Sequence, residues 1–301
     1  MSQDQQVSSN ALVVTDQSVS GRHGTIPTRH YATSHAAREA MPLIWLHGGA
    51  FAYGGLDQAE SDAPARALAA AGRPVVTVDY SLVPRWSWVK APRPGRLPGI
   101  RYPIPVEDVL DVVASVQAKA PDGKVFLGGA SAGACLAAAA TIRLREKGRI
   151  PEGLILFYGT FHAKLPPLSS ELRSRIRGRY AFAQFRAGTV EKMNRAYAGS
   201  PEAMHRADAF PGGHDLNQFP PTLMIDADHD SLRASGEAFA RELRKAHVSL
   251  DYAIPHRSRH GFLDKPGTEQ FHDALHRASQ WLRRCEHLSR QHPTGHNTPN
   301  P

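Results

Sequence analysis

The sequence predicts an α/β fold in which a mostly parallel central sheet has helices on both faces. Short apolar segments alternate along the chain with longer amphipathic segments. Apolar segments of this kind suit strands that are buried on both faces, as the strands of parallel sheets are. The chain has 301 residues, 41% of them hydrophobic, which suits one large domain with a sizeable core. We therefore expect residues 1–301 to form a single α/β domain.

The expected strands follow one another at intervals along the whole chain. Residues 11–21 and 24–33 indicate two strands separated by a turn. The apolar run at 41–49 ends in glycines, which suits a buried strand followed by a turn. Further strands are expected at 73–80, 124–129, 153–160, 220–225 and 249–255.

The expected helices lie between and after these strands. Apolar residues recur in them with the spacing of one helix face. In the last helix, for example, Phe271, Leu275, Ala278 and Leu282 share a face. Helices are expected at 59–72, 106–119, 132–140, 231–247 and 269–285.

Three segments break this alternation. Residues 84–105 are rich in proline and arginine and indicate a long loop. Residues 160–215 are rich in charged and aromatic residues and indicate an inserted segment of short helices. The polar tail at 291–301 is expected to be disordered.

Composition excludes several classes of protein. The formal net charge is +8 and the pI is about 9.7, but the positive charge is spread along the chain. No nucleic-acid-binding module is recognisable, so we expect no nucleic-acid partner. The two cysteines, Cys135 and Cys285, give neither a disulfide framework nor a zinc pattern. Because we find no secretory signal and no window as long as a membrane span, we expect a cytoplasmic protein without stable membrane insertion.

The segment 124–140, KVFLGGASAGACLAAAA, is compatible with two kinds of site. A strand, a glycine-rich turn and a helix form either a nucleophile turn or a phosphate-binding loop. The turn lies far from the first strand, where short-chain dehydrogenases bind their cofactor, and Cys135 stands where the last glycine of that loop is needed. No tyrosine is followed four residues later by a lysine, and no Gly-Lys-Ser/Thr follows the turn. These observations count against a nucleotide site.

The nucleophile interpretation explains more of the sequence. Gly129, Ser131 and Gly133 match G-x-S-x-G, in which the serine stands in a strained turn that its flanking glycines leave uncrowded. A glycine turn at 47–50, HGGA, also follows a strand and can aim backbone N–H groups at a developing oxyanion. Aspartates and then a histidine follow later strands, and the order Ser, Asp, His is that of the α/β-hydrolase triad. Chymotrypsin-like and subtilisin-like enzymes use other orders.

Together these motifs resemble the hormone-sensitive-lipase-like branch of the α/β hydrolases, which are bacterial carboxylesterases. The matching pieces run in family order from about residue 40 to 285 and are LHGGAF, VDYSLVP, YPIPVEDV, GGASAGA, PPTLMIDADHDSLRASGEAFARELRKA and HGF. The resemblance implies an α/β-hydrolase fold with a small helical cap, which residues 160–215 would form. It also implies a serine carboxylesterase that works through an acyl-enzyme, without a metal or an organic cofactor.

The resemblance implies a role for each matching residue. Ser131 would attack the ester carbonyl, His260 would take its proton and pass it to the leaving alcohol, and Asp230 would orient His260. The rivals for the acid and base roles are Asp226, Asp228 and His256. His47 would brace the glycine turn. The oxyanion hole would use the backbone N–H groups of Gly48, Gly49 and Ala132.

This chain departs from the family pattern at several positions. Ala50 stands where the family has a third glycine, Ala130 stands where it has an aspartate, and residues 85–101 form an insertion. A stiff, proline-rich insertion with two tryptophans predicts a narrow pocket and a preference for acyl chains of about two to four carbons. The residues expected to surround the pocket are Phe51, Tyr53, Trp86, Trp88, Tyr158 and Phe161. The basic run of Arg173, Arg175, Arg177 and Arg179 indicates a solvated face or, alternatively, contact with an acidic substrate or lipid head group.

Two other functions stay open on the sequence alone. An amide or formamide hydrolase, or a tailoring hydrolase of secondary metabolites, could use the same triad. A ligand receptor could have kept the fold without the catalysis, although the intact Ser131, Asp230 and His260 argue against it. The expected partner is a small-molecule ester, and a homodimer is compatible with the sequence.

Overall fold

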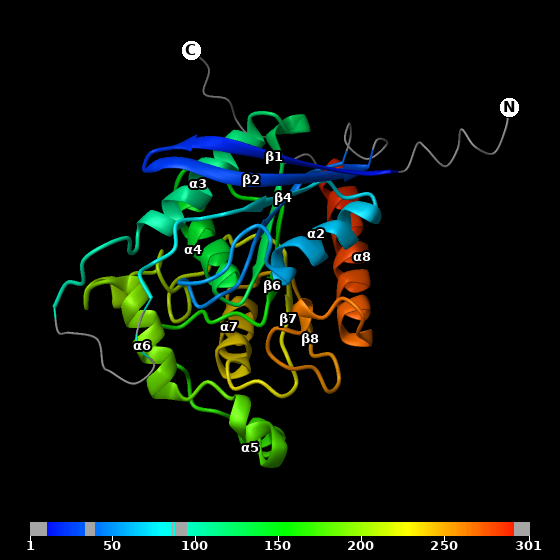
Figure 1. Cartoon of the computed structure of the whole chain (residues 1–301). Coiled ribbons are helices and arrows are strands. Elements are labelled where there is room, and N and C mark those ends of the chain that lie inside the picture. The colour runs from blue at the N-terminus through cyan, green and yellow to red at the C-terminus, as the bar shows by residue number, and fades with distance from the viewer. Residues whose placement is uncertain (1–10, 34–39, 86, 88–94, 292–301) are drawn as a thin grey trace, which may run out of the picture.

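The computed structural model describes residues 11–33, 40–85, 87 and 95–291, and within them eight strands form one sheet (Figure 1). The strand order is β1-β2-β4-β3-β5-β6-β7-β8. The first two strands pair antiparallel with each other, β2 pairs antiparallel with β4, and every later neighbour is parallel. The prediction of a mostly parallel sheet is therefore confirmed. The strands are β1 (Leu12–Gly21), β2 (Gly24–Thr33), β3 (Leu43–Leu46), β4 (Val75–Val78), β5 (Phe126–Ala130), β6 (Gly153–Phe157), β7 (Thr222–Ile225) and β8 (Leu250–Ala253).

Helices cover both faces of this sheet, as predicted (Figure 1). On one face, α2 (Ala59–Ala70) and α8 (Glu269–Gln291) pack their apolar sides against β3, β5, β6 and β7. On the other face, α3 (Ile104–Gln117), α4 (Ala132–Glu146) and α7 (Arg233–Lys245) contribute to a second apolar cluster. The middle strands β3–β7 are buried along their whole length, which explains their uninterrupted apolar sequences.

All five predicted helices differ from their predicted bounds at one end or both, and α4 continues past the predicted end at 140 to Glu146. The α3 helix begins at Ile104 instead of 106, because Pro103 stands at its N-cap and Pro105 fits within its first turn. The α8 helix continues past the predicted end at 285 to Gln291. Gln291 was expected in the disordered tail and is helical, whereas the rest of that tail lies outside the described residues.

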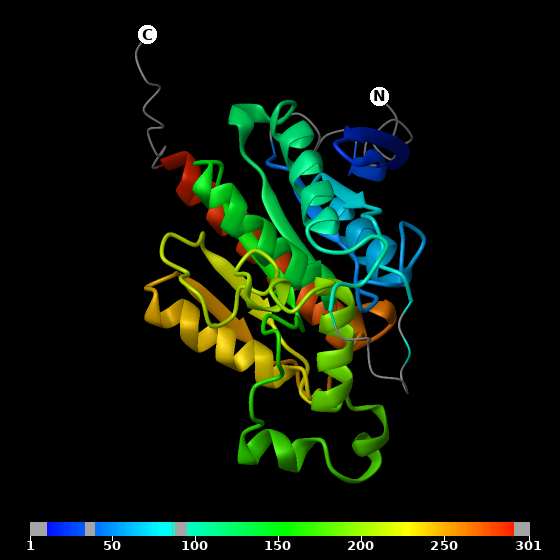
Figure 2. The same cartoon turned by 90° about the vertical axis from the view of Figure 1, so that its left-hand side faces the viewer.

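Residues 160–215 form an excursion from the sheet between β6 and β7. It contains α5 (Ser170–Arg175), α6 (Ala187–Ala198) and two short 3₁₀ turns, η4 (Gly178–Ala183) and η5 (Ala203–His205). The α5 helix projects away from the sheet in both views (Figures 1 and 2). The role of this excursion as a cap stays a prediction.

The insertion at 85–101 is described only in part. Trp86, Trp88 and residues 89–94 lie outside the described residues. At the end of the insertion, the N–H of Leu97 donates to the carbonyl of Gly199 over 2.6 Å, so this part lies against the end of α6. None of the helices in the described part of the chain has the length and apolarity to cross a membrane.

Candidate active site

Ser131 occupies a strained turn between β5 and α4. Its backbone angles are φ 53° and ψ −116°, a conformation that residues with a side chain rarely adopt. The chain crosses β3 closely at this turn: a Cβ on Gly129 would lie 2.6 Å from the carbonyl oxygen of Leu46, and one on Gly133 would collide with the same oxygen. The glycines of G-x-S-x-G are therefore required by the close approach of β3 to the end of β5 and to the first turn of α4. The turn lifts the serine side chain out at the carboxyl end of β5.

The structure brings Ser131, His260 and Asp230 into one hydrogen-bonded line. Ser131 Oγ lies 3.0 Å from His260 Nε2, and His260 Nδ1 lies 2.7 Å from Asp230 Oδ2. The other oxygen of Asp230 accepts the N–H of Leu232 over 3.0 Å, which fixes the orientation of the carboxylate. Asp230 is 1% exposed and Ser131 is 8% exposed, so the line is shielded from water apart from the serine and histidine tips.

The electrostatic environment of His260 favours its protonated form. Burial by itself would lower the pKa of His260, but the charges of Asp230, Glu60 and Asp264 and the hydrogen bond to Asp230 outweigh burial and raise it. A base that is stabilised as an imidazolium suits the removal of a proton from a neighbouring hydroxyl.

The rival residues lie elsewhere. Asp228 lies among basic groups, where its Oδ2 accepts the N–H of Arg257 over 3.0 Å and lies 3.5 Å from Nη1 of Arg175. Asp226 is fully buried and accepts the hydroxyl of Tyr252 over 2.7 Å. The side chain of His256 is 73% exposed and lies 3.7 Å from Asp228. None of the three reaches the line of Ser131, His260 and Asp230.

The glycine turn after β3 has a conformation suited to presenting N–H groups. Gly49, Ala50 and Phe51 all have positive φ angles, of 112°, 54° and 63°. Among the described residues, no acceptor is found for the N–H of Gly49 or of Ala132. The N–H of Gly48, by contrast, donates to Glu60 Oε2 over 2.8 Å. Of the three predicted oxyanion donors, Gly48 is therefore the one whose N–H has a partner among the described residues.

The imidazole ring of His47 supports this turn. Its Nδ1 lies 2.6 Å from the carbonyl oxygen of Gly48, and its ring stacks on Tyr80 at 4.4 Å between centroids. Burial lowers the pKa of His47 to about 4, so the ring is neutral at ordinary pH. His47 is therefore a structural support of the turn.

The predicted pocket residues lie in four different environments or fall outside the described residues. Phe51 and Phe161 are fully buried and stack on Tyr197 and Phe239, so they belong to the core behind the site. Tyr158 is also fully buried, but its ring lies 5.0 Å from that of His260. Tyr53 is half-buried beneath the guanidinium of Arg85. Trp86 and Trp88 lie outside the described residues.

Three residues near the site were not predicted, namely Glu60, Gln184 and Phe185. The ring of Phe185 lies 4.9 Å from that of His260. The side chain of Gln184 bonds the carbonyl of His229 and the N–H of Ser231, on either side of Asp230. Nothing in the sequence distinguishes these residues, because their roles depend on contacts with distant parts of the chain.

The described residues contain no group of three or more histidine, cysteine, aspartate or glutamate side chains that could hold a metal ion.

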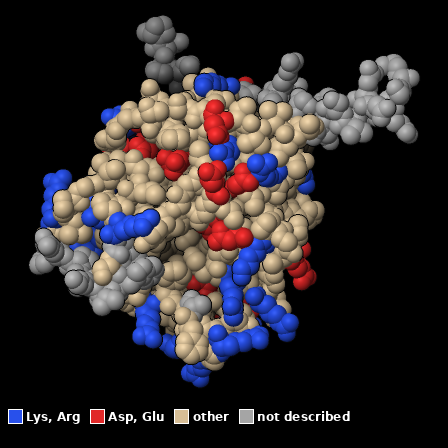
Figure 3. All heavy atoms as spheres, in the orientation of Figure 1, with Lys and Arg blue, Asp and Glu red and all other residues tan. Residues whose placement is uncertain are grey.

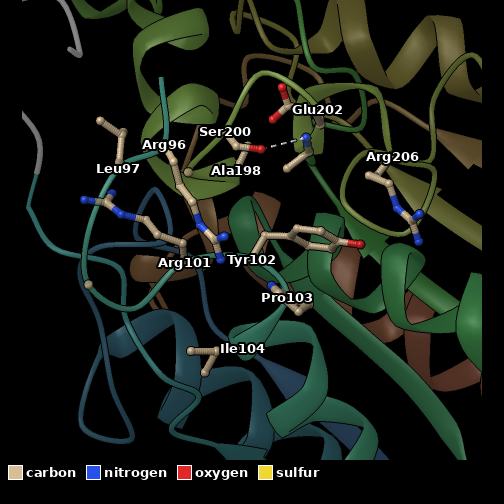
Figure 4. A pocket seen from close by; sticks show the side chains of 13 residues that line it. Arg96, Leu97, Arg101, Tyr102, Pro103, Ile104, Ala198, Ser200, Glu202 and Arg206 are labelled. Atoms are coloured by element: carbon tan, nitrogen blue, oxygen red, sulfur yellow. Dashed lines mark hydrogen bonds between the residues drawn. The ribbon is translucent and has the colours of Figure 1, made fainter. Parts of the chain in front are cut away.

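A cavity of about 410 Å³ lies between the end of the insertion and the end of α6 (Figure 4). Arginines line it, but Arg101 donates to the carbonyls of Pro98 and Ala196, and Arg206 pairs with Asp208. Because none of the predicted site residues lines this cavity, it is separate from the candidate active site.

Known proteins resemble this chain in sequence and in fold. A family model described as the alpha/beta hydrolase fold matches residues 43–264. The esterase LipI of Mycobacterium tuberculosis is 28% identical over 269 residues, covering 85% of this chain and 77% of that protein. An ethyl acetate hydrolase of Pseudomonas putida is 28% identical over 263 residues, covering 83% and 76%. The solved structure of an esterase from Pyrobaculum calidifontis superimposes with a TM-score of 0.74 at 28% identity, covering 92% and 85%.

Proposed function

This chain belongs to the family of α/β hydrolases, as its resemblance to the hormone-sensitive-lipase-like carboxylesterases predicted, and from that premise we propose that it hydrolyses carboxylic esters through an acyl-enzyme on Ser131. The observation that carries the proposal is the line from Ser131 Oγ through His260 to Asp230, with separations of 3.0 and 2.7 Å. A serine hydroxyl is a poor nucleophile until an adjacent base accepts its proton, and His260 stands where such a base is needed.

The mechanism follows from these positions. His260 Nε2 accepts the hydroxyl proton while Ser131 Oγ attacks the ester carbonyl, and Asp230 stabilises the resulting imidazolium. The carbonyl oxygen becomes an oxyanion, which the N–H groups of Gly49 and Ala132 would stabilise. His260 then gives its proton to the leaving alcohol. In the second half of the reaction, water attacks the acyl group in place of the alcohol, and the carboxylic acid is released from Ser131.

We assign the substrate to esters of short acyl chains, of about two to four carbons. Phe185 supports this assignment, because its ring lies 4.9 Å from that of His260 and takes up space beside the proposed base. One relative is named an ethyl acetate hydrolase and others are named acetyl esterases, which is compatible with a small acyl group. The contribution of Trp86 and Trp88 to a narrow pocket stays a prediction.

The proposal is tested by labelling and by turnover. A fluorophosphonate should label the wild-type protein at Ser131, and p-nitrophenyl acetate should give a burst of p-nitrophenol. Ser131→Ala should abolish labelling and reduce kcat by on the order of 10⁶-fold, because the triad acts as a unit. The matched control is Ser258→Ala, since Ser258 is a buried serine that bonds Asp228 N–H and not His260. An active Ser131→Ala protein, or labelling of a different serine, would refute the assignment.

A further inference from the structure

Glu60 is a buried carboxyl group beside the candidate active site that the proposed mechanism does not use. It lies in the first turn of α2 and is 3% exposed. Burial raises its pKa, which reflects the cost of placing an ionisable group there. A buried carboxyl is tolerated where its oxygens have hydrogen-bond donors, so the identity of the donors shows what the residue holds in place.

The two carboxyl oxygens of Glu60 hold two segments of the site. Oε2 accepts the N–H of Gly48 over 2.8 Å, and Oε1 accepts the hydroxyl of Tyr158 over 2.6 Å. The approach to Gly48 is so close that a Cβ there would collide with Oε2, and it would lie 3.1 Å from Cβ of Ser131. The carboxyl group therefore lies directly behind the glycine turn, next to the nucleophile.

The backbone of Glu60 is anchored in the same region. Pro64 has no N–H, so it cannot donate to the carbonyl of Glu60, four residues earlier in α2. The indole N–H of Trp45 in β3 donates to that carbonyl instead, over 2.9 Å. The charge of Asp264, four residues after His260, adds to the effect of burial and raises the pKa of Glu60 further.

Tyr158 extends these contacts to the histidine loop. Its ring lies 5.0 Å from the ring of His260 and 5.0 Å from that of Phe262, which follows His260 in the same loop. Through Glu60, the glycine turn after β3, the end of β6 and the loop that carries His260 are all joined to the first turn of α2.

We propose that Glu60 is a positioning residue, which holds the glycine turn and the His260 loop in the mutual arrangement that transition-state stabilisation requires. The inference rests on the proposed function. Glu60 does not touch the substrate; it acts through Gly48, whose N–H it fixes so that the next N–H, that of Gly49, faces the oxyanion. Misplacing such donors by about 1 Å costs on the order of 10²-fold in rate. Substrate binding in the ground state depends much less on them.

The test compares Glu60→Ala with Glu60→Gln. Glu60→Ala removes both contacts and should lower kcat by on the order of 10²-fold while KM changes less than about threefold. Glu60→Gln should retain activity within about tenfold of wild type, because its amide oxygen can accept from Gly48 and its amide N–H can donate to Tyr158. The affinity for a trifluoromethyl ketone, which forms an oxyanion on the serine, should fall in parallel with kcat/KM.

Two further variants keep the test decisive. Glu286→Ala is the matched control, because Glu286 in α8 is likewise buried and bonds the N–H of Met41 and the guanidinium of Arg73. These two residues precede β3 and β4, whereas Ser131 follows β5 at the opposite edge of the sheet. Glu286→Ala should lower the melting temperature without changing kcat. Tyr158→Phe removes the hydrogen bond from Tyr158 to Glu60 with little loss of volume. It tests the positioning role if Glu60→Ala does not fold. Its kcat should fall with KM unchanged.

The outcomes separate this inference from the proposed function. The positioning role would be overturned if Glu60→Ala kept the wild-type kcat and ketone affinity. If Glu60→Ala does not fold, the same result in Tyr158→Phe would overturn it. An equal effect of Glu286→Ala on kcat would also overturn it. A wild-type protein that fluorophosphonate does not label would overturn the proposed function itself, whatever the Glu60 variants do.

Discussion

Three aspartates within five residues at the end of β7 differ mainly in what surrounds their carboxyl groups. Asp230 bonds His260, Asp228 lies among arginines, and Asp226 bonds only Tyr252 within the described residues. The sequence motif selects Asp230 through its family resemblance. The separate environments of the other two could not be predicted, because they are created by Arg175 and by β8, which are distant in sequence.

The roles of Asp230 and Asp228 are separable by substitution. Asp230→Asn should leave the imidazole in the wrong tautomer and lower kcat by on the order of 10⁴-fold. Asp228→Asn should lower kcat by much less, because Asp228 has no contact with His260, although it should reduce the melting temperature. Steady-state kinetics on p-nitrophenyl acetate and thermal unfolding measure the two effects. The reverse order of kcat values would show that the acid has been assigned to the wrong aspartate.

Asp226 should make the stability of the protein depend on pH. Burial raises its pKa from 3.8 to about 8, and one of its oxygens has no partner among the described residues. Between about pH 4 and pH 8 the unfolded chain releases this proton and the folded protein keeps it. The free energy of unfolding therefore falls by up to about 1.4 kcal/mol per pH unit as the pH rises through this range, and the loss is complete above pH 8.

Asp226→Asn should remove this contribution, since an amide keeps an acceptor for Tyr252 and does not ionise. Urea unfolding of both proteins at pH 5, 6, 7 and 8 measures it as a difference. The advantage of the Asn variant should grow with pH. If the two stability curves run parallel, Asp226 is ionised in the folded protein and its burial does not act as described.

At the scale of elements, the sequence predicts strands and helices well where apolar patterning dominates. The buried strands β3 to β7 read directly as apolar runs. The first turn of α2 shows the limit: Glu60 looks like the acidic residues that commonly begin helices, which are favoured there by the helix dipole. Its burial depends on Tyr158, 98 residues away in the chain. No local pattern contains that contact.

The segment between η4 and α6 contacts the acid loop and the histidine together. Phe185 packs against His260 while Gln184 spans the backbone on both sides of Asp230. Phe185→Ala should therefore widen the site and shift the preference toward longer p-nitrophenyl esters. Each added methylene that fits gains up to about 0.8 kcal/mol.

Phe182→Ala is the control for this change. Phe182 lies three residues earlier in the same excursion and is 97% exposed, so its removal should leave the chain-length profile unaltered. Both profiles are obtained from kcat/KM across a series from acetate to octanoate. An unchanged profile in Phe185→Ala would show that another element limits the acyl pocket.

At the scale of the whole molecule, the parallel sheet explains why residues from distant segments meet. Ser131 follows β5, Tyr158 follows β6, Asp230 follows β7 and His260 follows β8, and the carboxyl ends of these strands lie along one edge. The alternation of strands and helices predicts this edge from the sequence. The arrangement of the excursion above it could not be predicted, because residues 160–215 have no regular apolar period.

The distribution of charge over the molecule adds a field at that edge. The formal net charge is +8, and basic side chains gather at the end of the molecule where α5 projects (Figure 3). Arg179 and Arg259 both stack on Tyr180, whose ring lies 3.7 Å from that of His229, next to Asp230. A positive field at this end of the molecule raises the local concentration of anionic substrates, and salt screens it with a Debye length of about 10 Å at 0.1 M.

A negatively charged ester should therefore respond to salt in a way that a neutral ester does not. We expect kcat/KM for p-nitrophenyl hydrogen succinate to fall roughly tenfold between 10 mM and 500 mM NaCl, because steering contributes at least that much where charges are exposed. For p-nitrophenyl butyrate, kcat/KM should stay constant.

Arg177→Gln/Arg179→Gln should flatten the salt dependence of the anionic ester. Lys119→Gln/Lys147→Gln removes the same charge after the ends of α3 and α4, at the opposite edge of the sheet, and should not. If both double variants flatten the dependence equally, net charge alone attracts the substrate and the arginine run has no local role. If neither variant does, the field that attracts the anionic ester arises from other groups.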